Sequence, residues 1–339
     1  MNLYLKPLIV SLLIIPFFIS CQKEKPAEYT LDGMVQGSYY HIVYYATQTQ
    51  NKTIKQDITN IFSQIDKSVS LWHKESIINQ INDNKNPTLD TIFIECFNKS
   101  QEISALTLGN LDCTIGALVE KYGFAAKNRE PITQTQIDSL LKYVGFKNLR
   151  IENQKLIKKY PQTKIDFNAI AQGYTTDKIS EYLLSQNIES FIVDVGGEVR
   201  ANGKKENGNL WRCAIEQPSD SIDSERKYNT YLELKNNSIV TSGNYRKYYI
   251  DESGTRKSHT ISPFNGKSVD HSLLSASVVA QNATLADGLA TAFMVMGLEK
   301  TKEFLRKHPP LKAHLIYWEN NQFQTYTTEN LKPEIKSLD

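Results

Sequence analysis

Cysteine is scarce in this sequence, and its positions exclude two common kinds of site. Four cysteines occur among 339 residues, at positions 21, 96, 113 and 213. They are too few and too far apart for the disulfide framework of a small secreted domain or for the paired spacing of a zinc site. We therefore expect Cys96, Cys113 and Cys213 to be small apolar side chains in the core.

An excess of either charge is also missing. The chain has 39 Lys and Arg against 37 Asp and Glu, which gives a formal net charge of +2. Proteins that bind nucleic acid usually carry a basic surface, so nucleic acid is not expected as the main partner. The paired glycines of DVGGEVRANG do not form a G-x-G-x-x-G motif, and a Rossmann dinucleotide site is therefore unsupported.

One long apolar run is present, and it lies near the N-terminus. Residues 8–20 follow a single lysine and end directly at Cys21. The run is short for a permanent transmembrane helix and suits a secretory signal. A cysteine at its end is typical of bacterial lipoproteins, in which cleavage leaves that cysteine as the lipidated first residue. Phe18 departs from the leucine usual at its position, so plain secretion remains the alternative.

These features predict a chain that is lipid-anchored in the bacterial cell envelope and faces the periplasm. Residues 1–20 are assigned to the signal peptide, and residues 21–30 to the lipidated cysteine and a short tether. Residues 31–325 are assigned to one large domain, and residues 326–339 to a C-terminal tail. No second apolar stretch is long enough to span a membrane, so we expect a soluble domain on a membrane tether.

Hydrophobic periodicity predicts an α+β fold with mixed or antiparallel sheets and packed helices. SYYHIVYYA alternates as a strand does, whereas the isoleucines of residues 52–82 have the spacing of one long helix. TIFIECFNKSQEISALTLG predicts a second helix, closed by Gly109. A hairpin is expected in NLRIENQKLIKKYP, and short strands are expected in WRCAIEQP, TYLEL and SIVTSG.

The middle of the chain predicts a ligand site. Residues 164–197 have the pattern of a strand, a tight turn, a helix and a second strand, with Ile165 and Phe167 in the first strand. The turn places Asp166 to Gln172 at a strand-to-helix junction. Backbone N–H groups converge on anions at such junctions, so we expect a ligand there.

A late helix carries an unexpected acid. ATLADGLATAFMVMG (residues 283–297) has an apolar stripe at helical spacing, interrupted by Asp287 and Thr291. These two residues are four positions apart and therefore share one face. A carboxylate in such apolar surroundings is costly unless something compensates it. Helix capping, a hydrogen-bonded core acid and a cation site all remain open on this evidence.

Three further polar positions stand out in otherwise apolar segments. Asp112 lies in LDCTIG, Asp166 in KIDFNAIAQGY, and His259 in the segment before SPFNG. Each has an ordinary structural interpretation, since either acid is placed to cap a following helix and lone histidines are often structural. The functional alternative is that all three belong to one site.

Taken in order, these segments resemble the FAD:protein FMN transferase family, the ApbE-type flavin-trafficking lipoproteins. GMVQGSYYHI is similar to the family's Met-Gly-Thr opening strand, LDCTIGALVEKYGF to its Asp-Pro-Thr segment, and KIDFNAIAQGYTTDKI to its Asp-Leu-Gly-Gly-Ile-Ala-Lys-Gly-Tyr segment. VDVGGEVRANG, TSGNYRKYY, SHTISPFNGKSV and ADGLATAFMVMG resemble its later motifs. The resemblance runs from about residue 34 to residue 297.

The resemblance implies an α+β enzyme that transfers FMN from FAD to a Thr or Ser hydroxyl of another protein and releases AMP. It implies Mg²⁺ as the cofactor, held by Asp287, Thr291 and the main-chain carbonyl of Ala169. Hard oxygen ligands of this kind suit magnesium. The acceptor is expected to carry a Ser/Thr-Gly-Ala-Thr-type motif, which this chain itself lacks.

The resemblance also assigns roles to residues that would contact FAD. Two residues are assigned to catalysis, His259 and Asp287. His259 would act as an acid or base or would position a phosphate. Ile261 would contribute backbone contacts beside that histidine. The remaining positions are assigned to the flavin, to the adenosine side or to the phosphates of FAD: Met34, Trp72, Asn110, Leu111, Asp112, Asp166 and Gln172.

Several positions depart from the family pattern, and two rival functions follow. Gln172 stands where lysine is common, which removes a positive charge near the phosphates. Asn168 replaces a glycine, Cys113 a proline and Ser262 an aspartate, and Val35 with Gln36 alters the opening strand. The rivals are an FAD pyrophosphatase that yields FMN and AMP, and a flavin-binding lipoprotein without turnover.

Overall fold

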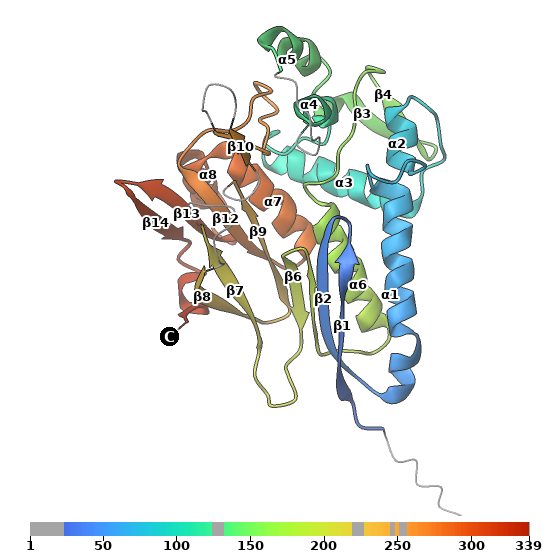
Figure 1. Cartoon of the computed structure of the whole chain (residues 1–339), viewed down its shortest axis with the longest axis vertical. Helices are drawn as coiled ribbons and strands as arrows, with labels where there is room; N and C mark the ends of the chain where they lie inside the picture. The colour runs from blue at the N-terminus through green and yellow to red at the C-terminus, as the bar shows by residue number, and fades with distance from the viewer. Residues whose placement is uncertain (1–23, 124–131, 219–226, 245–247, 251–255, 339) are drawn as a thin grey trace, which may run out of the picture.

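An eight-stranded antiparallel sheet forms the centre of the protein (Figure 1). The computed structural model describes residues 24–123, 132–218, 227–244, 248–250 and 256–338. Every pair of neighbouring strands in the sheet is antiparallel, which agrees with the predicted α+β class. The strands in spatial order are β1 (Ala27–Val35), β2 (Ser38–Ala46), β5 (Phe191–Val195), β6 (Glu198–Asn202), β9 (Asn237–Gly243), β12 (Leu273–Ala280), β13 (Lys312–Glu319) and β14 (Gln322–Thr327).

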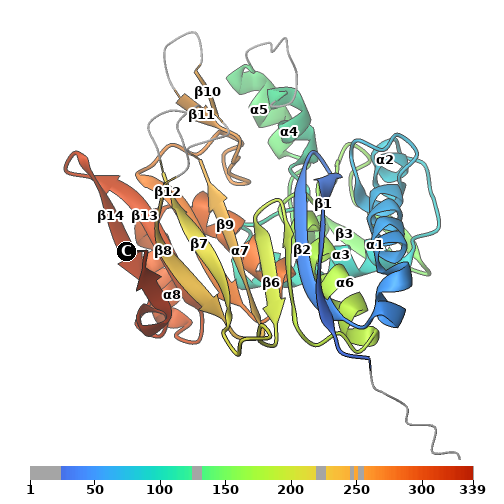
Figure 2. The same cartoon turned by 60° about the horizontal axis from the view of Figure 1, so that its bottom comes forward.

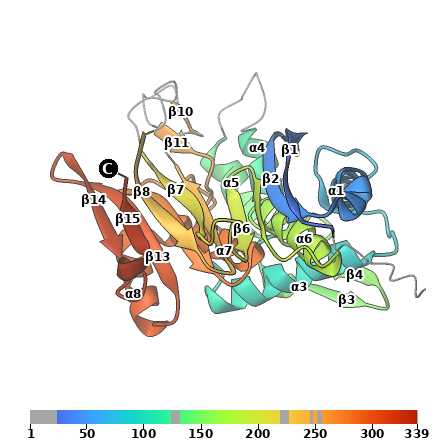
Figure 3. The ribbon, with the colours of Figure 1, turned by 90° about the horizontal axis from the view of Figure 1, so that it is seen from below.

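Helices cover one face of this sheet. The two central ones are α6 (Ala171–Ser185) and α7 (Ala283–Met296), which pack against each other and against the sheet (Figure 3). Ile42 on β2 and Val193 on β5 are buried in one cluster with Ile179 of α6. Burial of such apolar side chains between a sheet and a layer of helices is the main contribution to the stability of this layer.

A second, smaller sheet lies against the other face (Figure 2). Trp211 and Leu232 of this sheet share a buried cluster with Val43, Val199 and Ile239 of the large sheet. Val43 and Ile42 are adjacent in β2 and point to opposite faces, as the two-residue period of a strand requires. The strands of the small sheet, in spatial order, are β15 (Ile335–Ser337), β8 (Lys227–Leu234) and β7 (Trp211–Gln217).

The helix predicted across residues 52–82 is interrupted, so that prediction is wrong in its extent. Helix α1 (Gln48–Val69) ends at Ser70, whose backbone is extended. A turn follows, and α2 (Ile77–Asn82) begins after its own N-cap at Ser76. Apolar residues recur on both sides of this turn because the end of α1, with Ile65 and Val69, and α2, with Ile78 and Ile81, are buried in one cluster.

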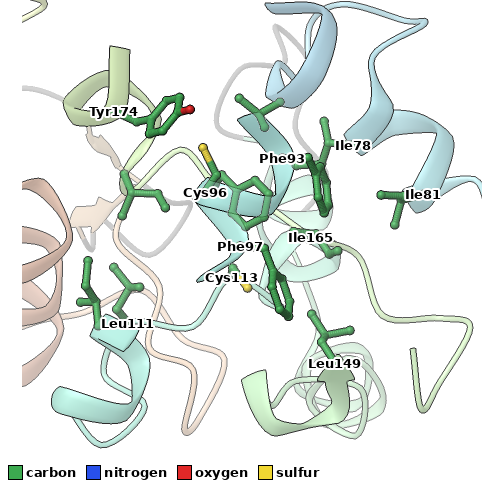
Figure 4. Close-up of a cluster of buried hydrophobic side chains, with 14 of the residues drawn as sticks. Ile78, Ile81, Phe93, Cys96, Phe97, Leu111, Cys113, Leu149, Ile165 and Tyr174 are labelled. Carbon is green, nitrogen blue, oxygen red and sulfur yellow. The ribbon is translucent and has the colours of Figure 1, made fainter. Parts of the chain in front are cut away.

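The remaining helices lie around this core. Helix α3 (Thr91–Leu106) ends as predicted near Gly109, whose N–H donates to Ser104 O at 2.8 Å. Figure 4 shows the cluster that α3 shares with neighbouring segments, in which Cys96 and Cys113 are both buried. Cys213 is only partly buried, so the expectation for the cysteines holds fully for two of the three. The other elements are α4 (Gly116–Tyr122), α5 (Gln134–Leu141), α8 (Leu298–Lys307), the hairpin β3 (Leu149–Glu152) with β4 (Lys155–Lys158), and β10 (Tyr248–Ile250) with β11 (Arg256–Ser258).

The stretch before α6 does not form the predicted strand. One parallel bridge joins Lys164 to Ile115. Among the described residues, the segment 164–167 forms no longer ladder with any strand. Instead, the side chain of Asn82 binds the backbone of Ile165, accepting its N–H at 2.7 Å and donating to its carbonyl at 2.9 Å. A side-chain amide therefore satisfies this backbone in place of a neighbouring strand.

Both ends of the predicted domain carry ordered strands. Strand β1 begins at Ala27, inside the stretch assigned to the tether, and β15 lies inside the stretch assigned to the C-terminal tail. Cys21 and the predicted signal peptide lie outside the described residues. Among the residues described, no helix has the length and apolar character needed to cross a membrane.

Candidate active site

One large cavity, of about 1650 Å³, gathers almost all the predicted site residues. Met34 is the exception: it lies near the end of β1, 79% exposed, while the nearby Gln36 and Gly37 line the cavity. The predicted residues that line it are Trp72, Asn110, Leu111, Asp112, Asp166, Ala169, Gln172, His259, Ile261, Asp287 and Thr291.

The first turn of α7 is capped without Asp287. Asn282 is the N-cap, and its side chain accepts a hydrogen bond from Leu285 N at 2.9 Å. Asp177, from the middle of α6, accepts from the backbone N–H groups of Ala283 at 2.9 Å and Thr284 at 2.8 Å. These acceptors use the free N–H groups of the helix start, so the capping interpretation of Asp287 is wrong.

Asp287 is a buried acid, and few neighbouring groups among the described residues offset the cost of burying its charge. Its side chain borders the cavity although the residue is only 5% exposed, and it accepts a hydrogen bond from Gly173 N at 3.1 Å. Burial raises the pKa of this carboxyl well above its usual value, and the nearby carboxylates of Glu198 and Asp177 act in the same direction. A cation beside Asp287 would favour its ionised form, because opposite charge offsets the cost of burial.

Thr291 lies one turn after Asp287 and also lines the cavity. Its Oγ1 is 3.3 Å from the hydroxyl oxygen of Ser242, on β9. Within the described residues, no group of three or more His, Cys, Asp or Glu side chains is placed to hold a metal. A cation at this helix would therefore need hydroxyl, carbonyl or ligand oxygens besides the Asp287 carboxylate, a donor set that suits Mg²⁺.

A glycine lets α6 reach the acid on α7. An ideal Cβ placed on Gly173 would lie 2.5 Å from the carbonyl oxygen of Ala283 and 2.9 Å from Cβ of Asp287. Any larger side chain there must push the two helices apart. The close approach brings the Gly173 N–H to Asp287 and places Ala169 and Gln172, just before that glycine, on the same cavity.

Asp112 organises the loop before α4 and does not cap that helix. Its Oδ1 accepts from Thr114 N at 2.8 Å and from Thr114 Oγ1 at 2.5 Å, and its Oδ2 accepts from Phe146 N at 2.8 Å. The N-cap of α4 is Ile115, which makes no side-chain cap. Burial raises the pKa of Asp112, while these hydrogen bonds oppose the rise.

Asp166 also fails to cap its helix. Its Oδ1 accepts from Asn168 N at 2.7 Å, which closes a local turn, and α6 begins later with Ile170 as an N-cap that lacks a side-chain bond. The Asp166 backbone N–H donates to the carbonyl of Cys113 at 2.8 Å. Two acidic segments from distant parts of the sequence therefore lie side by side at the cavity, and burial raises the pKa of Asp166.

His259 and Gln172 approach the cavity from different elements. His259 follows β11 and is partly buried, and the adjacent Thr260 donates to Asn244 Oδ1 at 2.8 Å. The Gln172 amide lies beside the turn between β5 and β6, with its Nε2 only 2.5 Å from an ideal Cβ on Gly196. Gly196 has φ of +71°, so the close approach and the backbone both favour glycine there.

Two acids of this region were not singled out by the sequence. Asp177 pairs with Arg200 at 2.7 Å, and the two side chains are 6% and 19% exposed. Glu198 lines the cavity near Asp287. Asp177 follows two threonines in a helix and has the pattern of a surface residue. Its partners are 23 and 107 residues away, so no local signal reveals its role.

The fold and cavity together define the class of protein. It is an α+β domain in which α7 brings the buried carboxyl of Asp287, and the segment before α6 that of Asp166, to a cavity large enough for an extended ligand. Pockets for single small molecules usually measure about 300–1,000 Å³. This cavity exceeds that range, which suits a large ligand or two ligands together.

The chain belongs to the ApbE family, whose family model matches residues 36–315. It is 31% identical over 318 residues to the FAD:protein FMN transferase of Vibrio cholerae serotype O1, covering 91% of this chain and 94% of that protein. The corresponding protein of Escherichia coli K12 is 30% identical over 340 residues, covering 95% and 94%. The solved structure of the flavin transferase ApbE from Vibrio cholerae has a TM-score of 0.81 at 29% identity, covering 91% of this chain and 99% of that one.

Proposed function

We propose that this protein is an FAD:protein FMN transferase. It takes FAD and moves the FMN moiety onto a Thr or Ser hydroxyl of an acceptor protein as a phosphoester, and AMP leaves. The observation that carries this proposal is the meeting of Asp287 and Thr291 of α7 with Ala169 and Gln172 at one cavity, in a chain that belongs to the ApbE family. The names of its relatives support the reaction.

Magnesium is the proposed cofactor. Asp287, Thr291 and the carbonyl of Ala169 would hold it. The fit is supported by the buried carboxyl of Asp287, which accepts a hydrogen bond from Gly173 N, and by the Thr291 hydroxyl one turn away. When bound, the ion supplies positive charge that neutralises the phosphate oxygens in the transition state. In the absence of this ion, burial raises the pKa of Asp287 above its usual value.

The reaction requires an acceptor hydroxyl in line with the leaving AMP. The hydroxyl oxygen bonds to the phosphorus of the FMN moiety, the bond from that phosphorus to the bridging oxygen breaks, and AMP departs with the bridging oxygen. His259 is proposed to accept the hydroxyl proton or to hold a phosphate oxygen. Its place on the cavity wall is the structural support for this role.

The remaining predicted residues are proposed to hold FAD. Trp72 is 74% exposed and Met34 79% exposed, so both offer apolar surface on which a flavin ring can stack. Asn110, Leu111 and Asp112 are proposed to contact the adenosine side, with Asp166, Gln172 and backbone groups at Ile261 completing the site. Gln172 supplies an amide where a lysine is common, so it contributes a hydrogen bond without charge.

Membrane attachment is proposed through lipidation of Cys21, which would place the domain at the envelope and facing the periplasm. The apolar run of residues 8–20 supports this proposal. Labelling cells with a radioactive or alkyne fatty acid should mark the wild-type protein and leave a Cys21→Ser variant unlabelled. A labelled Cys21→Ser variant would overturn the assignment, and equal absence of label on both proteins would favour plain secretion.

The proposed reaction is tested by mixing residues 22–339 with FAD, Mg²⁺ and a protein carrying a Ser-Gly-Ala-Thr segment. Transfer predicts flavin fluorescence that stays with the acceptor on a denaturing gel. An FAD pyrophosphatase predicts free FMN and AMP with an unlabelled acceptor, and a flavin-binding protein without turnover predicts unchanged FAD. An acceptor with alanine in place of its Ser and Thr is the matched control.

A further inference from the structure

The cavity has two arms that lie on opposite faces of the large sheet. The first arm contains Asp287 and Thr291 on the helical side. The second is lined by alternate residues of several strands: His41 and Val43 on β2, Ile192 and Asp194 on β5, and Ile239 and Thr241 on β9. Side chains two apart in a strand share one face, and the intervening Ile42, Val193 and Val240 pack toward the helices.

One wall of the second arm is the edge of strand β7. Trp211, Arg212, Cys213 and Ala214 are consecutive residues, and all four line the cavity. Consecutive side chains of a strand point to opposite faces, so a cavity that touches all of them runs along the edge of the strand. This arrangement exposes main-chain groups of β7 as well as its side chains.

The edge of β7 that meets the cavity carries no strand in the described part of the chain. The small sheet has the order β15, β8, β7, so β7 is hydrogen-bonded to β8 alone among the strands described. Residues of an antiparallel strand alternately direct their N–H and C=O groups to each side. An edge of this kind is a template on which an extended segment of another protein can add as a strand.

Other sheet edges lack this combination. Strands β14 and β15 end their sheets, but none of their residues lines the cavity, and β1 contributes only Glu28. The two arms join at the turn between β5 and β6, where Gly196 and Gly197 line the cavity, and at Ser242, next to Thr291. A segment lying along β7 therefore leads toward the proposed reaction centre.

We propose that the acceptor protein binds as an extended segment added to the edge of β7 that carries no other strand among the described residues, with its hydroxyl residue reaching around the β5–β6 turn toward Asp287. The inference rests on the proposed transferase function, which requires a second, protein substrate. The volume of about 1650 Å³ exceeds that of an ordinary small-molecule pocket, which leaves room for this substrate beside FAD. Main-chain pairing would hold the segment with little demand on its sequence, and Trp211 and Cys213 would contact its side chains.

Backbone hydrogen exchange tests the binding step separately from the chemistry. The full-length protein is mixed with an acceptor protein whose Ser-Gly-Ala-Thr segment has alanine in place of Ser and Thr, so that it binds without being modified. Exchange within residues 211–217 should slow by about tenfold or more on saturation, while β14 remains unchanged. Unchanged exchange in β7 despite bound acceptor overturns the inference, as does protection that depends only on the concentration of this protein, since a second copy would then be the occupant.

A bulky substitution tests the same groove through kinetics. Ala214 is exposed, and Ala214→Trp should obstruct the groove and raise the KM for the acceptor by about tenfold, with FAD affinity and kcat near wild type. Thr325→Trp, on the exposed edge strand β14, is the matched control and should leave every constant unchanged. An unchanged acceptor KM in a folded Ala214→Trp variant overturns the inference. Failure of the wild-type protein to transfer any FMN overturns the proposed function instead, and the exchange experiment then still reports whether a protein binds at β7.

Discussion

Replacing Asp287 by asparagine should make the protein more stable without magnesium and unable to respond to it. Asparagine keeps an oxygen that accepts the hydrogen bond from Gly173 N, but it removes a buried negative charge close to Glu198 and Asp177. A buried polar group with too few partners costs about 1–3 kcal/mol, and more when it is charged, so Asp287→Asn should gain at least about 1 kcal/mol of stability in a chelating buffer.

Magnesium should stabilise the wild type and leave the stability of Asp287→Asn unchanged. At a concentration of 100 times its dissociation constant, a bound ion stabilises the native state by about 2.7 kcal/mol, which corresponds to a rise in Tm of roughly 5 °C in a chain of this length. Calorimetric scans with and without Mg²⁺ should show this rise for wild type and for the exposed control Asp138→Asn, and no rise for Asp287→Asn. An equal response of wild type and Asp287→Asn to magnesium would refute the assignment of Asp287 as an ion ligand. A loss of stability of Asp287→Asn in chelator would refute the argument about its buried charge.

Further substitutions test other parts of the site. Gly173→Ala should lose about 1–3 kcal/mol in urea unfolding, because its Cβ meets the backbone of α7, and a stability equal to wild type would contradict the close approach of α6 and α7. Asp177→Ala should lose about 3–5 kcal/mol by the same measurement, since it leaves Arg200 unpaired and removes two helix-start hydrogen bonds; a loss below about 1 kcal/mol would show that the pair contributes little. His259→Ala should slow single-turnover transfer by about 10²–10⁴-fold with FAD affinity near wild type, and an unchanged rate would remove His259 from the chemistry. Gln172→Lys should lower the KM for FAD several-fold by adding positive charge beside the phosphates, and a raised KM would contradict the proposed position of those phosphates.

The sequence indicates the local part of the site well. Asp287 and Thr291 are four residues apart in an apolar helix, so their common face follows from helical geometry, and both line the cavity. Strands β2 and β7 and the hairpin β3–β4 follow from alternation and turn residues, because those signals are contained within a few positions. Residues that lie far apart in the sequence, such as Ala169 and His259, are assigned to the site only by the resemblance to a family.

The parts that the sequence misjudged depend on distant partners. Residues 164–167 have the composition of a strand, yet Asn82 binds their backbone from 83 residues away. Asp112 and Asp166 precede helices as caps do, but both bind local turns instead. Asp177 stabilises the start of α7 across 107 residues, and no local pattern distinguishes it from an acid on the protein surface.

The most direct measurement of the central claim is the intact mass of an acceptor protein after incubation with FAD and Mg²⁺, together with the amount of AMP formed. The account predicts that wild type adds one FMN, less one water, to each acceptor and releases one AMP for each adduct, while Asp287→Asn forms neither product. Adducts formed at the wild-type rate by Asp287→Asn would contradict the role of the α7 site. AMP and free FMN released with the acceptor unmodified would contradict the transfer itself.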